Sequence, residues 1–475
     1  MTADKSNKCN QENNPCQEKP QSPCQSKPNP CQPQPSPCQP KTSPCPTAVG
    51  CRSANTTHQQ RAAPPPANTC ATKNDPCRSN SVSPCSASKP PATGTGSCPM
   101  SYFDNMVGNC LAYAEEAKAA GKPVVGIFCE YTPREIIMAV GAVPVCMCGG
   151  SEATIPAAEE DLPASICPLI KSSYGYAKLR NNPFLEMSEL LVAETTCDGK
   201  KKMYELLSKY KKMFILELPQ KADDPDAFRH WKAEIVKLKE YLENQFNVKI
   251  TDRKLKEAIK TMNEERRLRI RIAELAGNKV PLLSGMQVLG AKSLISGIPE
   301  DFKMYQKLIS EIEAEDKRQP VQCTGRPRIM LTGVPMPHEA EKVMRVIEEA
   351  GGSVVAQESC SGLKPIDLPV NEDGDPLQAI AEKYFHLPCS VMTPNTRRLD
   401  FFDKLISQYK PQAVIDVVWQ GCHTYNVESF LIQKYFEEKH HLPYLKLETD
   451  YSQSDSAQIK VRVQALLEIV KSKNY

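Results

Sequence analysis

The sequence lacks any uninterrupted run of 18 apolar residues, which argues against a membrane-spanning helix. Its N-terminus also lacks the apolar core that a secretory signal needs, and this favours a cytoplasmic protein. Cysteines in that compartment are more often metal ligands or redox groups than halves of disulfides. The 21 cysteines of this chain therefore favour a metal-binding protein.

Two nucleotide-binding motifs are also missing. The sequence contains no G-x-x-x-x-G-K-S/T phosphate loop, and no G-x-G-x-x-G fingerprint follows an expected strand. If a reaction of this protein needs ATP, another protein must therefore bind it. Charge gives no sign of a nucleic-acid partner, because residues 1–98 carry a formal charge of +6 and residues 99–475 about −3.

Aromatic residues are absent from residues 1–98, which hold 18 of the 41 prolines and 11 of the 21 cysteines. Such a segment cannot bury enough apolar surface to offset the entropy lost on ordering, so we expect a disordered Cys/Pro-rich tail. Its cysteines lack the paired C-x-x-C spacing of a structural zinc site, and we assign the tail no chemistry.

From residue 99 onward, apolar runs typical of strands alternate with helical patterns. This alternation predicts an α/β protein in which helices cover parallel sheets. Residues 225–320 are instead rich in Lys, Glu, Arg and Leu with helical periodicity, which predicts a helical connecting region. We therefore predict two Rossmann-like α/β domains, residues 99–224 and 321–475, joined by a helical segment.

Six cysteines lie at positions where such sheets build sites. Each half of the chain carries three of them in the same order, at a strand end, in a loop before a helix, and at another strand end. They are Cys129, Cys167 and Cys197 in the first half and Cys360, Cys389 and Cys422 in the second. Loops at the carboxyl edge of parallel strands lie beside helix N-termini, whose partial positive charge favours a thiolate.

Three thiols in each half favour iron–sulfur chemistry. Cysteine thiolates bind a 4Fe4S cluster, and a cluster held by three of them keeps one iron open for another ligand. Zinc needs four ligands, usually in close pairs, and nucleophilic catalysis needs one cysteine with a histidine base. Neither explains six separate thiols. We expect the remaining cysteines of this region to pack as small hydrophobes, although two of them alternate along a strand and are weaker candidates for flanking the site: Cys110, Cys323, Cys146 and Cys148.

His423 follows Cys422 directly and is a candidate for donating a proton or a hydrogen bond to a cluster sulfide, because imidazole titrates near neutrality. A histidine packed in the loop is the alternative interpretation. Lys171, Glu358 and Arg397 are further candidates for residues beside the ligands.

Several motifs follow one another along residues 100–475: 131–135 (YTPRE), 139–144 (AVGAVP), 167–168 (CP), 196–199 (TCDG), 420–423 (QGCH) and 442–450 (LPYLKLETD). Together they resemble the 2-hydroxyacyl-CoA dehydratase and benzoyl-CoA reductase subunit family. Dehydratase subunits of that family hold one 4Fe4S cluster by three cysteines. The resemblance carries these ligands most directly to Cys167, Cys197 and Cys422.

The further thiols of Cys129, Cys360 and Cys389 resemble those of the double-cubane cluster proteins of the family. These are homodimers in which two 4Fe4S units share a bridging sulfide as an Fe8S9 cluster. Six thiols match three per cubane, and we expect them to group by half of the chain unless the fold mixes the halves. The resemblance also implies a dimeric iron–sulfur ATPase as electron-donating partner, and ATP-driven reduction of small molecules such as acetylene, azide or hydrazine.

Two other functions stay open. A 2-hydroxyacyl-CoA dehydratase subunit with a single 4Fe4S cluster would be a lyase that binds an acyl-CoA and pairs with an unlike subunit. A noncatalytic electron-transfer or cluster-carrier protein would use the tail as a store of iron or sulfur. Iron content separates the first two functions, with about eight atoms per chain for the double cubane and about four for the dehydratase.

Overall fold

The computed structural model describes residues 99–318 and 325–473. The predicted tail, residues 1–98, and Cys323 lie outside the described residues. All described residues belong to one unit, Ser79–Tyr475. None of the helices in these two ranges combines the length and apolarity needed to cross a lipid bilayer.

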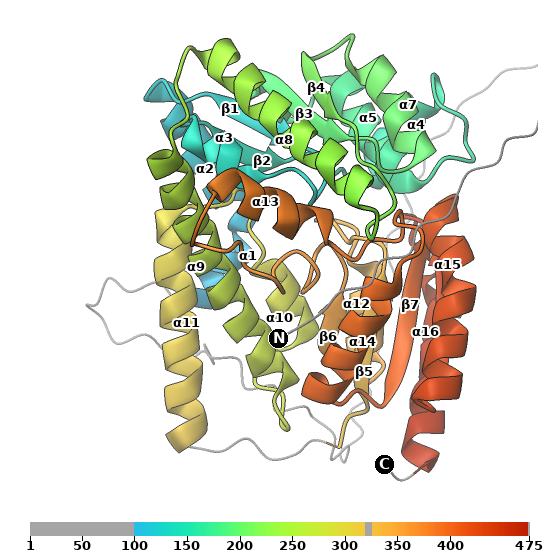
Figure 1. Ribbon diagram of the computed structural model, residues 1–475. Coiled ribbons are helices and arrows are strands. Elements are labelled where there is room, and N and C mark those ends of the chain that lie inside the picture. Colours follow the sequence, from blue (N-terminus) through green and yellow to red (C-terminus); the bar gives the residue numbers. More distant parts are fainter. Residues whose placement is uncertain (1–98, 319–324, 474–475) are drawn as a thin grey trace, which may run out of the picture. The chain divides into compact units, whose positions relative to one another are not determined.

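The first sheet consists of four parallel strands in the order β2-β1-β3-β4 (Figure 1). The central strands β1 and β3 are buried along their whole length, which explains their nearly continuous apolar sequences. The strands are β1 (Val124–Ile127), β2 (Val143–Cys146), β3 (Leu190–Glu194) and β4 (Met213–Leu216). The helices of this half are α1 (Pro99–Asp104), α2 (Met106–Ala119), α3 (Arg134–Ala139), η1 (Glu152–Thr154), α4 (Ile155–Glu159), α5 (Pro168–Leu179), α6 (Pro183–Met187) and α7 (Asp198–Leu207).

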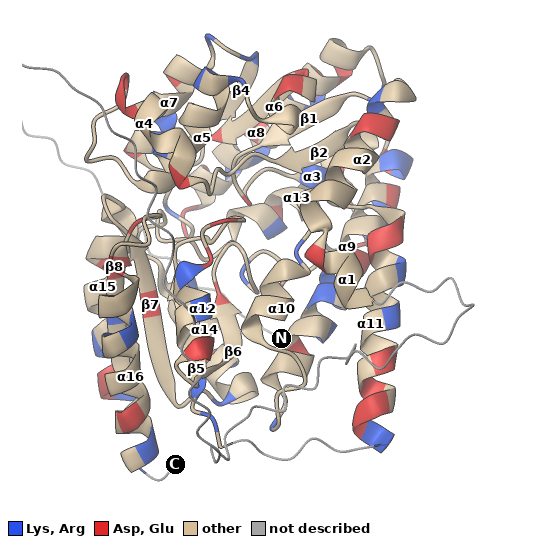
Figure 2. Ribbon diagram, turned by 180° about the vertical axis from the view of Figure 1, so that it is seen from behind, with Lys and Arg blue, Asp and Glu red and all other residues tan. Residues whose placement is uncertain are grey.

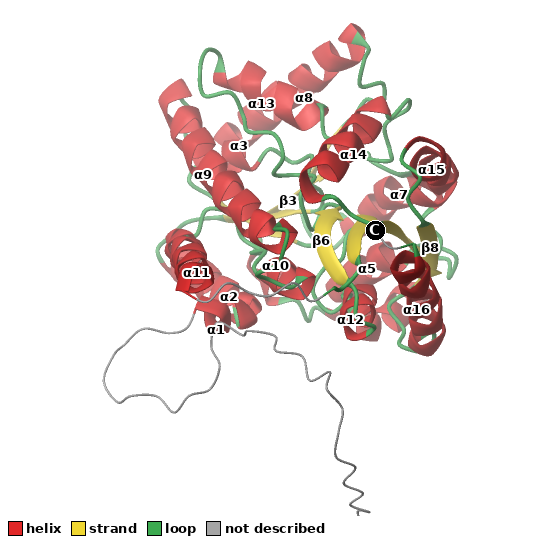
Figure 3. Cartoon of the chain, turned by 90° about the horizontal axis from the view of Figure 1, so that it is seen from below, coloured by secondary structure: helices red, strands yellow, loops and turns green. Residues whose placement is uncertain are grey.

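The second sheet repeats this topology with the parallel order β6-β5-β7-β8. Figure 3 shows α14 and α15 on one side of this sheet and α12 and α16 on the other. The strands are β5 (Arg328–Gly333), β6 (Ser353–Glu358), β7 (Ala413–Trp419) and β8 (Tyr444–Thr449). The helices are α12 (Lys342–Glu349), α13 (Pro376–Phe385), α14 (Thr396–Tyr409), α15 (His423–Lys434), η2 (Tyr435–Lys439) and α16 (Ser456–Ser472).

Four helices connect the two sheets: α8 (Pro225–Phe246), α9 (Asp252–Gly277), α10 (Gly285–Gly290) and α11 (Pro299–Arg318). The Thr251 side chain caps α9 by accepting a hydrogen bond from the backbone of Lys254. Helix α9 packs against α3 of the first half and β6 of the second. Its buried Arg266 lies 2.6 Å from Glu135 of α3, so α9 ties the first half to the second. Both signs of charge occur along α11 and α16 (Figure 2).

The two sheets share a hydrophobic core. Neighbouring residues of β3 point to opposite faces, so Leu191 belongs to the shared core and Val192 to a second core that includes Tyr384 of α13. Ile329 of β5 and Ile415 of β7 lie in the same shared core as Leu191. The predicted fold class, two parallel sheets with covering helices, is thus confirmed, whereas the domain boundaries at residues 224 and 320 stay a prediction.

Candidate metal centre

The loop after β7 and the loop before α5 approach each other at backbone distance. Gly421 has a φ of 76°, and a Cβ atom added to it would lie 2.3 Å from the carbonyl oxygen of Ser165 and 3.1 Å from the amide nitrogen of Cys167. Glycine alone tolerates both this φ and this contact. The QGCH motif therefore serves to bring Cys422 of the second half against Cys167 of the first.

Three of the six predicted cysteines are the N-cap residues of helices. Cys167 precedes α5, Cys197 precedes α7 and Cys422 precedes α15, and none of their side chains makes a capping hydrogen bond. We call these three the cap group. Their thiols are electrostatic neighbours, because Cys167 interacts with Cys197 and Cys422, and Cys422 with Cys197. Three helix N-termini thus direct positive ends toward one set of free sulfur atoms.

The other three cysteines form a second set, the loop group. Cys129 follows β1, Cys360 follows β6, and Cys389 lies between α13 and α14. The Cys129 thiol interacts with those of Cys360 and Cys389, and Cys360 also interacts with Cys389. Cys389 is in addition a neighbour of Cys422, so it connects the loop group to the cap group.

The electrostatic neighbours of these thiols mix the two halves of the chain, which is the alternative to the expected grouping by half. The cap group combines two cysteines of the first half with one of the second, and the loop group combines one of the first half with two of the second. The loops at the carboxyl ends of both sheets meet at Gly421 and Cys167, so thiols interact across this junction. Which cysteines would share one cubane stays a prediction.

Burial and mutual repulsion raise the pKa of four of these thiols, those of Cys129, Cys167, Cys360 and Cys422. Burial raises the pKa of Cys167 to about 12, and the Cys422 and Cys197 thiols add to the rise. The pKa of Cys422 is raised to about 11, again mainly by burial. Burial likewise raises the pKa of Cys360 to about 11, although Lys364 opposes the rise. A bound cation reverses this balance, because a metal holds its cysteine ligands as thiolates.

The arrangement fits a cluster better than a single ion. Within residues 99–318 and 325–473, no three His, Cys, Asp or Glu side chains are placed to hold one metal ion. All nine described cysteines are free of disulfides. A cluster distributes its ligands over several irons, so its thiolates stand farther apart than the ligands of one ion. The donor set therefore suits iron–sulfur chemistry, and the assignment of the six cysteines as ligands stays a prediction.

Three lysines beside the thiols were not expected from the sequence. The Nζ atom of Lys200 donates to the Phe128 carbonyl at 2.8 Å, and Lys200 has Cys129 and Cys197 among its charged neighbours. The Nζ atom of Lys292 donates to the Cys360 carbonyl at 2.8 Å. Lys364 is nearly fully buried and lies near Tyr425, whose hydroxyl is 4.0 Å from the Cys389 sulfur. Only Lys200 carried a sequence signal, because it directly follows the TCDG motif.

The two weaker cysteine candidates line a cavity together with Cys129 and Cys360. We call this space the thiol cavity; its volume is about 70 Å³. Cys148 donates to the Phe128 carbonyl at 3.3 Å, and the neighbouring Cys148 thiol lowers the pKa of Cys146. Both thiols therefore flank the loop group. Cys110 is instead buried beside Ser293, as expected of a packed cysteine.

The remaining candidates have varied surroundings. His423 is exposed and lines a cleft with Lys171, so it is not packed in the loop. Glu358 is fully buried and pairs at 2.9 Å with both Lys364 and Arg398. Arg397 is exposed, and it is its neighbour Arg398 that occupies the buried position beside Glu358.

The fold and the six thiols define a class of protein, an α/β protein in which free cysteines follow the elements of two parallel sheets. Residues 129–470 match the family described as "2-hydroxyglutaryl-CoA dehydratase, D-component", and the chain belongs to this family. The match begins at Cys129 and extends through Cys422, so it includes all six predicted cysteines.

Named relatives of the chain are dehydratase and reductase subunits. YjiM of Escherichia coli (strain K12), provisionally named a dehydratase subunit, is 41% identical over 361 residues, which cover 75% of this chain and 93% of YjiM. The beta subunit of lactoyl-CoA dehydratase from Anaerotignum propionicum is 23% identical, over 78% of this chain and 98% of that protein. A benzoyl-CoA reductase subunit of Thauera aromatica is 22% identical, over 63% of this chain and 77% of that protein.

Proposed function

We propose that the chain is an iron–sulfur reductase whose six cysteines bind a double-cubane Fe8S9 cluster. The observation that carries the proposal is the adjacency of the cap group and the loop group, with Cys389 and Cys422 as neighbours between them. Three thiolates per cubane leave one iron of each cubane for a bridging sulfide. Membership in a family of dehydratase and reductase subunits supports the coarser part of the proposal, an enzyme of this dehydratase and reductase type.

The residues around the thiols are suited to stabilising such a group. When bound, the cluster would supply electrons at low potential. The N-termini of α5, α7 and α15 offset its negative charge, and Lys200 and Lys292 add positive charge close to the loop group. The thiol cavity, with Cys129 and Cys360 in its wall, offers space for a small substrate beside the metal.

A reaction that needs ATP requires another protein to bind it, because the sequence contains neither nucleotide-binding motif. The proposed electron donor is a dimeric iron–sulfur ATPase that docks transiently on a homodimer of this chain. The proposed reaction is the ATP-dependent reduction of a small unsaturated or nitrogen-containing molecule. With dithionite as the source of electrons and with the ATPase and ATP present, acetylene should take up two electrons and two protons to give ethylene, and omission of any of the three components should abolish the product.

Iron and acid-labile sulfide per chain, measured on anaerobically purified protein, test the cluster. We expect about eight irons and nine sulfides per chain. Cys389→Ser removes a ligand of the loop group and should lower the iron content to about four, while Cys110→Ser, a substitution of a packed cysteine, should leave it at about eight. Full iron content in the Cys389→Ser protein would contradict the proposal.

A second candidate is a 2-hydroxyacyl-CoA dehydratase subunit that holds one 4Fe4S cluster with the cap group. Its support is that the cap group alone supplies three thiols, each at a helix N-terminus, and that two relatives are named acyl-CoA dehydratase subunits. This function predicts about four irons in the unmodified chain, an unlike partner subunit and turnover of a 2-hydroxyacyl-CoA. Cys389→Ser would then leave the iron content unchanged.

A further inference from the structure

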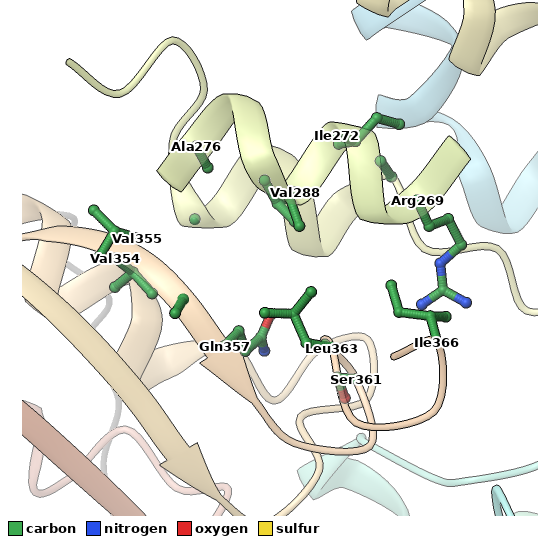
Figure 4. Close-up of a pocket in the computed structure, with 15 residues that line it drawn as sticks. Arg269, Ile272, Ala276, Val288, Val354, Val355, Gln357, Ser361, Leu363 and Ile366 are labelled. Carbon is green, nitrogen blue, oxygen red and sulfur yellow. The ribbon is translucent and has the colours of Figure 1, made fainter. Parts of the chain in front are cut away.

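A second cavity lies between α9, α10 and β6, beside the thiol cavity. Most of its wall is apolar, with Ile272 and Ala276 from α9 and Val355 from β6 (Figure 4). Its volume is about 30 Å³. Because a single water molecule needs about 10–15 Å³ of such space, this cavity accepts a molecule of two or three non-hydrogen atoms. We call it the Gln357 pocket.

Gln357 gives this mostly apolar pocket a polar group that could bind a ligand. Its side chain is 5% exposed, and neither its amide oxygen nor its amide nitrogen has a hydrogen-bond partner. Buried amides are almost always hydrogen-bonded, so two unpaired atoms on one side chain indicate a missing ligand. Figure 4 shows the Gln357 amide beside Leu363, below the helices, and the Arg269 guanidinium beside Ile366 at the opposite end of the pocket. The free amide offers both donor and acceptor atoms.

The pocket has an outer and an inner side. Of its lining residues, Arg269 and Val288 keep partial contact with solvent and form the outer rim, whereas the others are buried. Ser361 lines both the Gln357 pocket and the thiol cavity, and it directly follows Cys360. Its hydroxyl accepts from the amide and donates to the carbonyl of Met336, which also lines the thiol cavity. The shared residue places the two cavities side by side.

We propose that the Gln357 pocket is a binding chamber through which a small uncharged molecule reaches the thiol cavity, with Gln357 as its specificity-determining residue. This inference rests on the proposed function, because it supplies the substrate route to the same metal centre. The chamber favours molecules of two or three non-hydrogen atoms that carry both a donor and an acceptor, a class that includes hydrazine. It is too small for an acyl-CoA.

Steady-state kinetics with two substrates of similar size test the role of Gln357 in the holoenzyme. Hydrazine can form hydrogen bonds with the Gln357 amide, whereas acetylene cannot form hydrogen bonds of similar strength. Gln357→Leu should raise the KM for hydrazine about 5-fold, because a loss of one or two hydrogen bonds weakens binding by about that factor. The KM for acetylene, the kcat for both substrates and the iron content should stay unchanged. An unchanged KM for hydrazine, or an equal change for both substrates, would overturn the assignment and leave a pocket that holds only water.

A substitution in the outer rim of the Gln357 pocket tests whether substrates pass through this pocket. Val288→Phe narrows the outer side and should raise the KM for both substrates without loss of iron, whereas Val461→Phe, on the exposed face of α16, should change neither KM. Xenon gives a readout that does not depend on turnover: crystals of the wild-type holoenzyme under xenon pressure should show xenon in the Gln357 pocket, and crystals of Val288→Phe should not. A pocket without xenon in the wild type would refute the chamber. An iron-replete wild type that reduces neither substrate would instead refute the proposed function.

Discussion

Gly421→Ala tests the close approach that brings the second half of the chain to the cap group. An alanine at a φ of 76° costs about 1–2 kcal/mol of folding free energy, because its Cβ crowds the backbone. The same Cβ would lie 2.3 Å from the Ser165 carbonyl oxygen, whereas ordinary contacts begin near 3.4 Å. The two loops must therefore separate by about 1 Å, at a further cost of roughly 1–3 kcal/mol.

Such a separation matters most for the metal. Metal–ligand distances tolerate deviations of only about 0.2 Å, so a shift of about 1 Å between Cys422 and Cys167 should release the cubane that the cap group is proposed to hold. We expect Gly421→Ala to retain about half the iron of the wild type. Iron and sulfide content per chain and urea-induced unfolding, both measured anaerobically, report the two effects separately.

Gly121→Ala is a matched control, because Gly121 has a φ of 79° and no atom within 4 Å of the added Cβ. It should lose about 1–2 kcal/mol of stability and keep all its iron. The reasoning would be refuted by a Gly421→Ala protein that retains full iron content and is no less stable than Gly121→Ala.

Two buried charges give further predictions. Burial alone would raise the pKa of Glu358, but Arg398 and Lys364 outweigh it and lower this pKa. The charge of Glu358 therefore stabilises the fold fully at pH values above about 4.3, the usual pKa of Glu. This stabilisation is lost as the pH falls through the lowered pKa. Glu358→Gln should therefore cost about 3–5 kcal/mol at pH 7 in chemical unfolding, and less as the pH falls below 4; an equal cost at both pH values would contradict this. Lys200→Met removes positive charge beside both thiol groups and should lower the reduction potential of the metal centre by on the order of 50 mV, with iron content unchanged, in a redox titration followed by electron paramagnetic resonance. Lys202→Met, an exposed lysine of the same helix, should leave the potential unchanged.

Local patterns were sufficient for the fold class. Strands buried on both faces, such as β1 and β3, are nearly continuous apolar runs, so they can be recognised in the sequence before their partner strands are known. The sequence also predicted that three cysteines directly precede helices, because each lies between an extended segment and a segment with helical periodicity: Cys167, Cys197 and Cys422. Chain order also indicated the repeat of three cysteines in each half.

Only the tertiary structure decided which thiols are neighbours and what surrounds them. Gly421 brings Cys422 to the first half through a contact that no local pattern encodes, so thiols of the two halves interact. The unpaired amide of Gln357 and the burial of Arg398 in place of Arg397 depend on the assembled core. The sequence by itself thus determined the elements and the candidate ligands, because both follow from short-range periodicity and residue chemistry. The contacts between distant loops determined which of these cysteines interact, because such contacts depend on how two separate sheets pack together.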